Sequence, residues 1–133
     1  MQDFSFATVK TIISGLGSCQ KQLGTAAKSL AMTRAVVVSD KGIVASGMIE
    51  LALASLHAAG IDSVVYTDVV ADPSEAIIEK ALAFAREQKV DGVIGLGGGS
   101  SMDVAKVVAL LAYSAQGLPQ VYGVANATGS RLP

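Results

Sequence analysis

The chain has 133 residues, which is enough for one domain of ordinary size but too few for two. Hydrophobic residues make up 51% and charged residues only 16%, against about 25% charged in typical globular proteins, so intrinsic disorder is excluded. Ten basic and eleven acidic residues nearly balance, which gives no electrostatic reason to expect nucleic acid or an anionic membrane as a partner. A single cysteine, Cys19, and a single histidine, His57, exclude an internal disulfide framework and a multi-histidine metal site.

Neither a targeting signal nor a membrane span is predicted. The first ten residues lack the basic region and apolar core of a signal peptide. Residues 107–130 carry no charge, but glutamine, glycine, proline and asparagine interrupt them, so they do not predict a spanning helix. We therefore expect a cytoplasmic protein. The high apolar content predicts that part of the surface is covered by another molecule, and we expect a homo-oligomer.

Apolar periodicity alternates between strand-like and helix-like segments along the chain. The predicted strands cover residues 8–14, 34–39, 63–66 and 90–96. The predicted helices cover residues 18–33, 43–59, 72–89 and 101–115, and the third of them is expected to begin with Asp72 as its N-terminal cap. Strands that are apolar on both faces and alternate with helices predict an α/β fold with a parallel sheet. The turn-rich residues 116–133 contain no closing element, although a fifth strand would be expected there.

The strongest functional signal is the glycine run Gly97–Gly99, between a predicted strand and a predicted helix. Without Cβ atoms this backbone can turn sharply and let a phosphate group come close. Free N–H groups and the dipole at the helix start favour an anion such as pyrophosphate. The alternative is a plain turn, with Ser100 as the helix cap and Asp103 completing a capping box. A Walker-type loop is excluded because no Gly-Lys-Ser/Thr follows.

Asp40 follows a predicted strand, at the place where a ribose-binding acid is expected. Its carboxylate could accept the adenosine ribose hydroxyls and would repel a 2′-phosphate. The alternative role is to cap the next helix. A second glycine turn, Gly15–Gly17, begins like a dinucleotide-binding fingerprint, but Gln20 occupies the position of the third glycine.

Three further reactive side chains have simpler interpretations. His57 lies on a polar, solvent-facing stripe of a predicted helix, and Cys19 is more readily explained as an inert thiol at a helix start. Lys106 is placed to form a local ion pair with Asp103, three residues before it.

Residues 97–106 read GGGSSMDVAK and closely resemble the GGGS-x-x-D-x-A-K signature of the iron-containing alcohol dehydrogenases. Three other segments resemble that family in order and spacing. Residues 14–17 resemble its first glycine turn, residues 36–42 its V-x-x-D segment, and residues 72–74 its N-P-T segment, with Asp72 in place of asparagine. The resemblance extends from about residue 6 to residue 133.

The resemblance implies a Rossmann-like parallel sheet with helices on both faces, in which residues 1–133 form an NAD(P)-binding domain truncated before its last strands. By this match, Gly98, Gly99 and Ser100 contact the pyrophosphate, Gly97 and Ser101 are further cofactor-binding residues, Asp103 lies beside them facing the cleft, and Asp40 holds the adenosine ribose. NAD is expected rather than NADP.

In the whole enzyme of this family, Fe²⁺ or Zn²⁺ is held by an Asp and three His of a helical domain, and hydride passes between an alcohol or aldehyde and NAD(P). None of those ligand positions exists in this chain, so we expect neither catalytic nor metal-binding residues here and no turnover by the chain alone. Two alternatives remain open. One is a non-catalytic nucleotide-binding module, and the other is a relative of glycerol dehydrogenase or dehydroquinate synthase.

Overall fold

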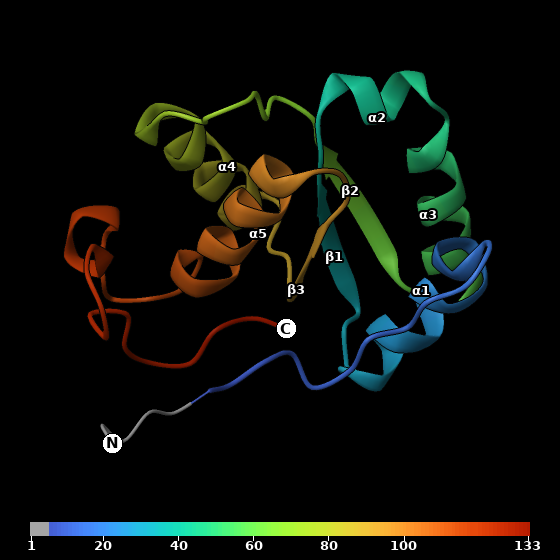
Figure 1. The fold of residues 1–133 in the computed structure, drawn as a ribbon, viewed down its shortest axis with the longest axis horizontal. Helices are drawn as coiled ribbons and strands as arrows, with labels where there is room; N and C mark the ends of the chain where they lie inside the picture. The colour runs from blue at the N-terminus through green and yellow to red at the C-terminus, as the bar shows by residue number, and fades with distance from the viewer. Residues whose placement is uncertain (1–5) are drawn as a thin grey trace.

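A computed structural model describes residues 6–133. Its centre is a three-stranded parallel sheet in the order β2-β1-β3 (Figure 1). The strands are β1 (Arg34–Val38), β2 (Asp62–Tyr66) and β3 (Gly92–Gly95). In the register of the sheet, Val36 lies opposite Val64 on one side and Val93 on the other. The first strand in the chain is therefore the central strand, and both of its neighbours come later in the sequence.

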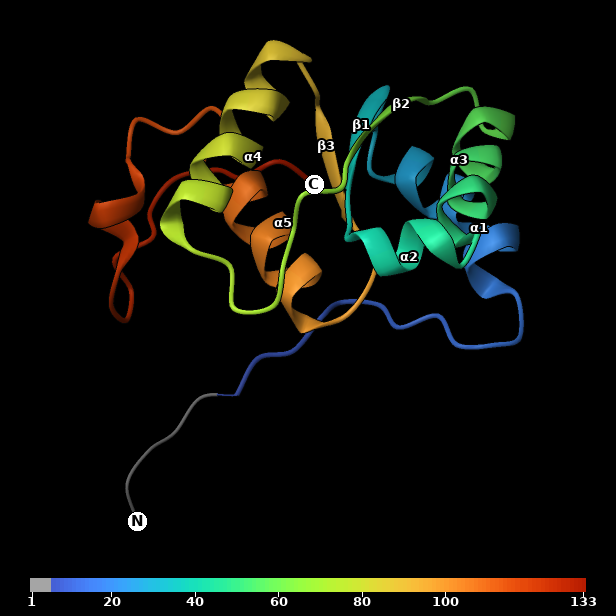
Figure 2. The ribbon, with the colours of Figure 1, turned by 90° about the horizontal axis from the view of Figure 1, so that it is seen from above.

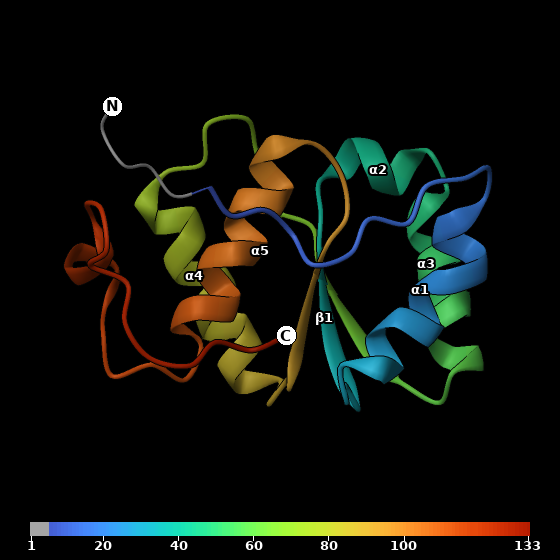
Figure 3. The ribbon, with the colours of Figure 1, turned by 60° about the horizontal axis from the view of Figure 1, so that its bottom comes forward.

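Helices cover both faces of this sheet (Figure 3). One face carries α1 (Ser18–Ser29) and α3 (Met48–Ala58), with the short α2 (Lys41–Ala45) before α3, and the other carries α4 (Glu75–Glu87) and α5 (Gly99–Leu111). The predicted α/β fold with a parallel sheet between two helix layers is confirmed. In the part of the chain described, none of the helices is long and apolar enough to cross a membrane.

The central strand separates two hydrophobic cores. Val36 and Val38 pack among residues of α4 and α5, whereas Ala35 and Val37 pack among residues of α1 and α3. All four side chains are fully buried. A strand enclosed on both faces needs apolar side chains in both directions, which explains the uninterrupted apolar run in the sequence.

The side chain of Asp91 fixes β3 against the start of β1. Its carboxylate accepts hydrogen bonds from the backbone N–H of Thr33 at 2.9 Å and of Arg34 at 2.8 Å, and from the Thr33 hydroxyl. Burial raises the pKa of Asp91, but the hydrogen bonds of Thr33 and of the backbone outweigh it and hold the pKa below the ordinary value. Arg34 in turn pairs with Asp62, so the start of β1 is tied to both neighbouring strands.

The predicted strand at residues 8–14 is wrong, because residues 6–17 form neither helix nor strand. Their apolar side chains are exposed, including Phe6, Ile12 and Leu16. A strand needs a partner for its backbone N–H and C=O groups, and residues 6–17 pair with none of β1, β2 and β3, although β2 and β3 each have an open outer edge. β-Branched residues alone therefore do not make this segment a strand in the isolated chain.

Several predicted helix limits also change. The helix expected over residues 43–59 is divided at Gly47, whose φ of 76° is left-handed and interrupts the helical backbone. Asp72 does not cap the next helix, because its own φ is 48° and the cap position is held by Ser74. The first helix ends before Ala31, which has a φ of 60°.

The last segment returns to the free edge of β3. After a 3₁₀ turn, η1 (Leu118–Val121), the chain runs back so that the C-terminus lies beside β3 (Figure 2). The Leu132 N–H donates to the Ala109 carbonyl at 2.9 Å, and the Pro133 carbonyl accepts from the Val93 N–H at 2.9 Å. Within residues 116–133 no strand forms, so β3 remains an edge strand that meets this segment through the Val93–Pro133 hydrogen bond.

Candidate functional site

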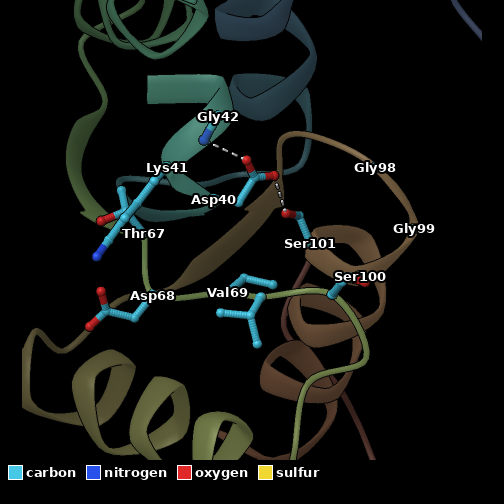
Figure 4. A pocket seen from close by; sticks show the side chains of 12 residues that line it. Asp40, Lys41, Gly42, Thr67, Asp68, Val69, Gly98, Gly99, Ser100 and Ser101 are labelled. Atoms are coloured by element: carbon cyan, nitrogen blue, oxygen red, sulfur yellow. Dashed lines mark hydrogen bonds between the residues drawn. The ribbon is translucent and has the colours of Figure 1, made fainter. Parts of the chain in front are cut away.

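A pocket of about 510 Å³ lies where the carboxyl ends of the three parallel strands meet. Each strand supplies one part of its lining: Asp40–Gly42 after β1, Thr67–Ala71 after β2, and Gly98–Ser101 after β3 (Figure 4). In open α/β sheets, ligands bind in the crevice outside the carboxyl ends of the strands. The pocket therefore occupies the position at which this architecture binds ligands.

The glycine run Gly97–Gly99 forms the turn between β3 and α5. The steric surroundings of Gly97 differ from those of Gly98 and Gly99. Gly97 has a φ of 141°, and a Cβ there would lie 3.0 Å from the Ser101 hydroxyl and 3.1 Å from an Asp40 carboxylate oxygen. Gly98 and Gly99 have ordinary backbone angles, and a Cβ at either would meet open space. Gly97 is thus required by the protein's own packing, whereas the space beside Gly98 and Gly99 is open.

The first turn of α5 lacks a side-chain cap. Gly98 occupies the cap position, and the helix begins at Gly99, so the predicted cap by Ser100 and the capping box with Asp103 are wrong. Glycine has no side chain that could accept from the N–H groups of the first turn, and these groups have no acceptor within the helix. The combination of free N–H groups and the positive end of the helix dipole can hold an anion.

Asp40 has the capping role that was its alternative interpretation. Its Oδ1 accepts from the Gly42 N–H at 2.9 Å and from the Ile43 N–H at 3.1 Å at the start of α2. Its Oδ2 accepts from the Ser101 hydroxyl at 3.3 Å. The carboxylate lies at the edge of the pocket, between α2 and the glycine turn (Figure 4).

The residues predicted for the site do not all come together. The structure places Asp40, Gly98, Gly99, Ser100 and Ser101 around the pocket, and Gly97 lies directly behind them. Asp103 is outside this lining. It is exposed and forms an ion pair with Lys106 at 3.2 Å, as the spacing of these two residues predicted.

Sequence reasoning missed the part of the pocket that follows β2. Thr67, Asp68 and Val69 line it there, with Lys41 beside them from the start of α2 (Figure 4). Lys41 brings a cation and Asp68 a second carboxylate into a site for which only Asp40 was expected. Their position shortly after β1 and β2 was the available signal, because side chains after parallel strands gather at one edge of the sheet.

The described residues contain no group of three His, Cys, Asp or Glu side chains that could hold a metal ion. His57 is exposed on α3, and Cys19 is partly buried at the start of α1. The arrangement therefore suits an organic anion held by backbone N–H groups, and it offers nothing that would fit a catalytic transition metal.

Comparison with known proteins gives a consistent picture. A sequence model of the iron-containing alcohol dehydrogenases matches residues 10–133. Long-chain-alcohol dehydrogenase 1 of Geobacillus thermodenitrificans is 43% identical over 91 residues, which cover 68% of this chain and 23% of that protein.

Solved structures agree with the sequence matches. NADH-dependent butanol dehydrogenase A of Thermotoga maritima superimposes with a TM-score of 0.79 and 30% identity, covering 87% of this chain and 29% of that one. A 1,3-propanediol oxidoreductase superimposes with a TM-score of 0.84 and 27% identity, covering 90% of this chain and 31% of that one. The chain thus spans about a quarter to a third of the length of these relatives. On this evidence the chain belongs to the iron-containing alcohol dehydrogenase family.

Proposed function

We propose that this chain is the NAD-binding portion of an alcohol dehydrogenase that transfers hydride between an alcohol or aldehyde and NAD. The observation that carries the proposal is the pocket at the strand ends, in which a ligand-accessible glycine turn faces an acidic side chain. Membership of the family supports it, and the related butanol dehydrogenase is NADH-dependent.

In this proposal the pyrophosphate lies against Gly98 and Gly99, where the absence of Cβ atoms leaves room for it. The N–H groups in the first turn of α5 donate to its oxygens, and the helix dipole favours its negative charge. Ser100 and Ser101 belong to the same turn. The carboxylate of Asp40 faces the adenosine ribose and accepts from a ribose hydroxyl.

Bound NAD⁺ supplies the hydride acceptor, while the chain positions it. The Fe²⁺ or Zn²⁺ expected in the whole enzyme finds no set of ligands among residues 6–133, so we derive no step through it. We also propose that the chain alone has no dehydrogenase activity, that the protein is cytoplasmic, and that it forms a homo-oligomer. The exposed apolar side chains of residues 6–17 support the assembly.

NAD is preferred over NADP in this proposal because of the charge at Asp40. A 2′-phosphate on the adenosine ribose would come close to this carboxylate, and juxtaposed like charges commonly cost several kcal/mol at an interface. The pocket lining also contains a cation, Lys41, which directly follows Asp40, but its side chain is directed toward Thr67 and Asp68 (Figure 4).

Isothermal titration of the chain with NAD⁺ and NADP⁺ tests the proposal, with Asp40→Asn as the informative variant. Asparagine is as good a helix cap as aspartate, so this change removes the charge while keeping the start of α2. We expect the unmodified chain to prefer NAD⁺ and the variant to lose the preference. Glu50→Gln, on exposed α3 surface, is the matched charge control and should keep it. Equal affinities of the unmodified chain for both dinucleotides would overturn the role of Asp40, and absence of binding would overturn the site.

A further inference from the structure

Ser101 is a buried polar residue whose side chain faces the proposed ribose-binding acid. It lies in the first turn of α5 and is only 1% exposed. Its hydroxyl lies 3.3 Å from Oδ2 of Asp40, which comes from the end of β1 (Figure 4). A hydroxyl so deeply buried is usually paired, and this carboxylate is the partner that the structure gives it.

The hydrogen bonds of Asp40 leave little freedom for a ligand. Each carboxylate oxygen has about two lone-pair positions. Oδ1 already accepts two backbone N–H groups of α2, so its positions are filled. Oδ2 accepts the Ser101 hydroxyl and keeps one position free. A ribose hydroxyl can therefore donate a hydrogen bond only to Oδ2. The direction of the free acceptor position on Oδ2 depends on the hydrogen bond from Ser101.

The contact between these two side chains also explains the glycine at position 97. A Cβ at Gly97 would lie 3.0 Å from the Ser101 hydroxyl oxygen and 3.1 Å from Asp40 Oδ2, tighter than most Cβ contacts. Any larger residue there would press on both ends of the hydrogen bond. The backbone of the glycine turn is thus shaped to let Asp40 and Ser101 meet.

We propose that Ser101 is a positioning residue for cofactor discrimination: its hydroxyl fixes the Asp40 carboxylate so that Oδ2 accepts a ribose hydroxyl and opposes a 2′-phosphate. This inference rests on the proposed function. It assigns Ser101 an action through Asp40 rather than a direct contact with the dinucleotide.

Ser101→Ala tests the inference, measured as the ratio of the NADP⁺ and NAD⁺ dissociation constants. Loss of a hydrogen bond to a charged group predicts a fall in this ratio of about threefold to tenfold, because Oδ2 loses its partner and can swing away from a 2′-phosphate while Oδ1 stays on the N–H groups of α2. Ser55→Ala is the control. Ser55 is half-buried, and its hydroxyl accepts from the Gly24 N–H between α1 and α3, away from the pocket, so this variant should leave the ratio unchanged.

A double-mutant cycle separates action through Asp40 from direct contact. In the Asp40→Asn background, Ser101→Ala should no longer change the ratio, because the charge that it positions is gone. An unchanged or raised ratio for Ser101→Ala alone would overturn the inference, and so would an equal fall in both backgrounds. These results are distinguishable from failure of the proposed function, in which the unmodified chain itself shows no binding or no preference.

Discussion

The hydroxyl of Ser39 donates to the carbonyl oxygen of Leu96 at 2.6 Å, joining the end of the central strand to the start of the glycine turn. Ser39 is fully buried, so this bond is sheltered from competing water. The backbone continues the connection, because the Leu96 N–H donates to the Val38 carbonyl at 2.9 Å. The position of the glycine turn is therefore set by the core of the sheet rather than by the surface loop itself.

Gly98→Val should abolish nucleotide binding while the domain stays folded. The backbone angles at position 98 are ordinary ones that valine can adopt, and a side chain there would meet open space in the protein. It would therefore fill only the volume that we assign to the phosphate. We expect at least a tenfold loss of NAD⁺ affinity by calorimetry, which corresponds to about 1.4 kcal/mol. Gly15→Val is the control, because a Cβ at Gly15 also meets open space but lies outside the pocket. Unchanged affinity in Gly98→Val would contradict the phosphate assignment.

Gly24→Ala should destabilise the fold by about 2 kcal/mol, through overpacking between two helices. Gly24 is where α1 touches α3: its N–H donates to the Ser55 hydroxyl at 3.0 Å, and a Cβ there would lie 2.1 Å from the Ser55 carbonyl oxygen. Urea unfolding measures the change. Gly99→Ala at the start of α5, where a Cβ meets open space, should cause no such loss. If Gly24→Ala behaves like ordinary helical Gly→Ala changes and gains stability, the close packing of α1 on α3 is wrong.

Asp91→Asn should lower the free energy of unfolding at neutral pH by roughly 1 kcal/mol, since the amide replaces a charged acceptor of several hydrogen bonds. The folded state holds the pKa of Asp91 below its ordinary value of 3.8. The contribution of this carboxylate is therefore complete above pH 3.8, and it is lost as the pH falls through the lower pKa of the folded state.

Urea unfolding of both proteins over a pH series measures this dependence. The difference between the unmodified chain and Asp91→Asn should stay constant from pH 7 down to about pH 5 and shrink toward zero at lower pH. Glu87→Gln, an exposed carboxylate near the same end of the sheet, is the control for general charge effects. A difference that persists undiminished in acid would contradict the ionised role of Asp91.

Metal analysis after dialysis should find well under one transition metal ion per chain, and alcohol with NAD⁺ should give no NADH. A catalytic zinc or iron site needs about three protein ligands, mainly His, Cys or carboxylates. Residues 6–133 bring no such group together. A stoichiometric metal with alcohol-dependent NADH formation would contradict this prediction. It would also contradict the proposal that this chain supplies the NAD site and none of the metal ligands.

The sequence predicted correctly the elements whose apolar pattern reflects burial against adjacent helices and strands. The apolar run of β1 and the stripe Val104, Val107, Val108 and Leu111 of α5 reflect burial against adjacent elements, and each lies in the predicted element. Residues 8–14 have the composition of a strand, but whether they form one depends on pairing with another strand, which composition does not encode.

For the candidate site, the glycine turn was predictable from the local sequence, because three glycines between a strand and a helix allow the backbone to turn sharply. The cap at Ser100 was not, because the helix starts at Gly99, two residues earlier than a cap at Ser100 predicts. Lys41 and Asp68 were missed because their approach depends on which strands are neighbours in the sheet, and the order β2-β1-β3 is a tertiary property.

The strand order also has a consequence for how the chain folds. The residue Arg34 in β1 meets Asp62 across 28 residues of sequence and Asp91 across 57. During synthesis β1 therefore leaves the ribosome before both of its neighbours and stays unpaired until they have followed. Parallel pairing over such separations raises contact order and slows folding. Until both neighbours have formed, β1 presents apolar side chains and unpaired strand edges, which are the features that favour aggregation of folding intermediates.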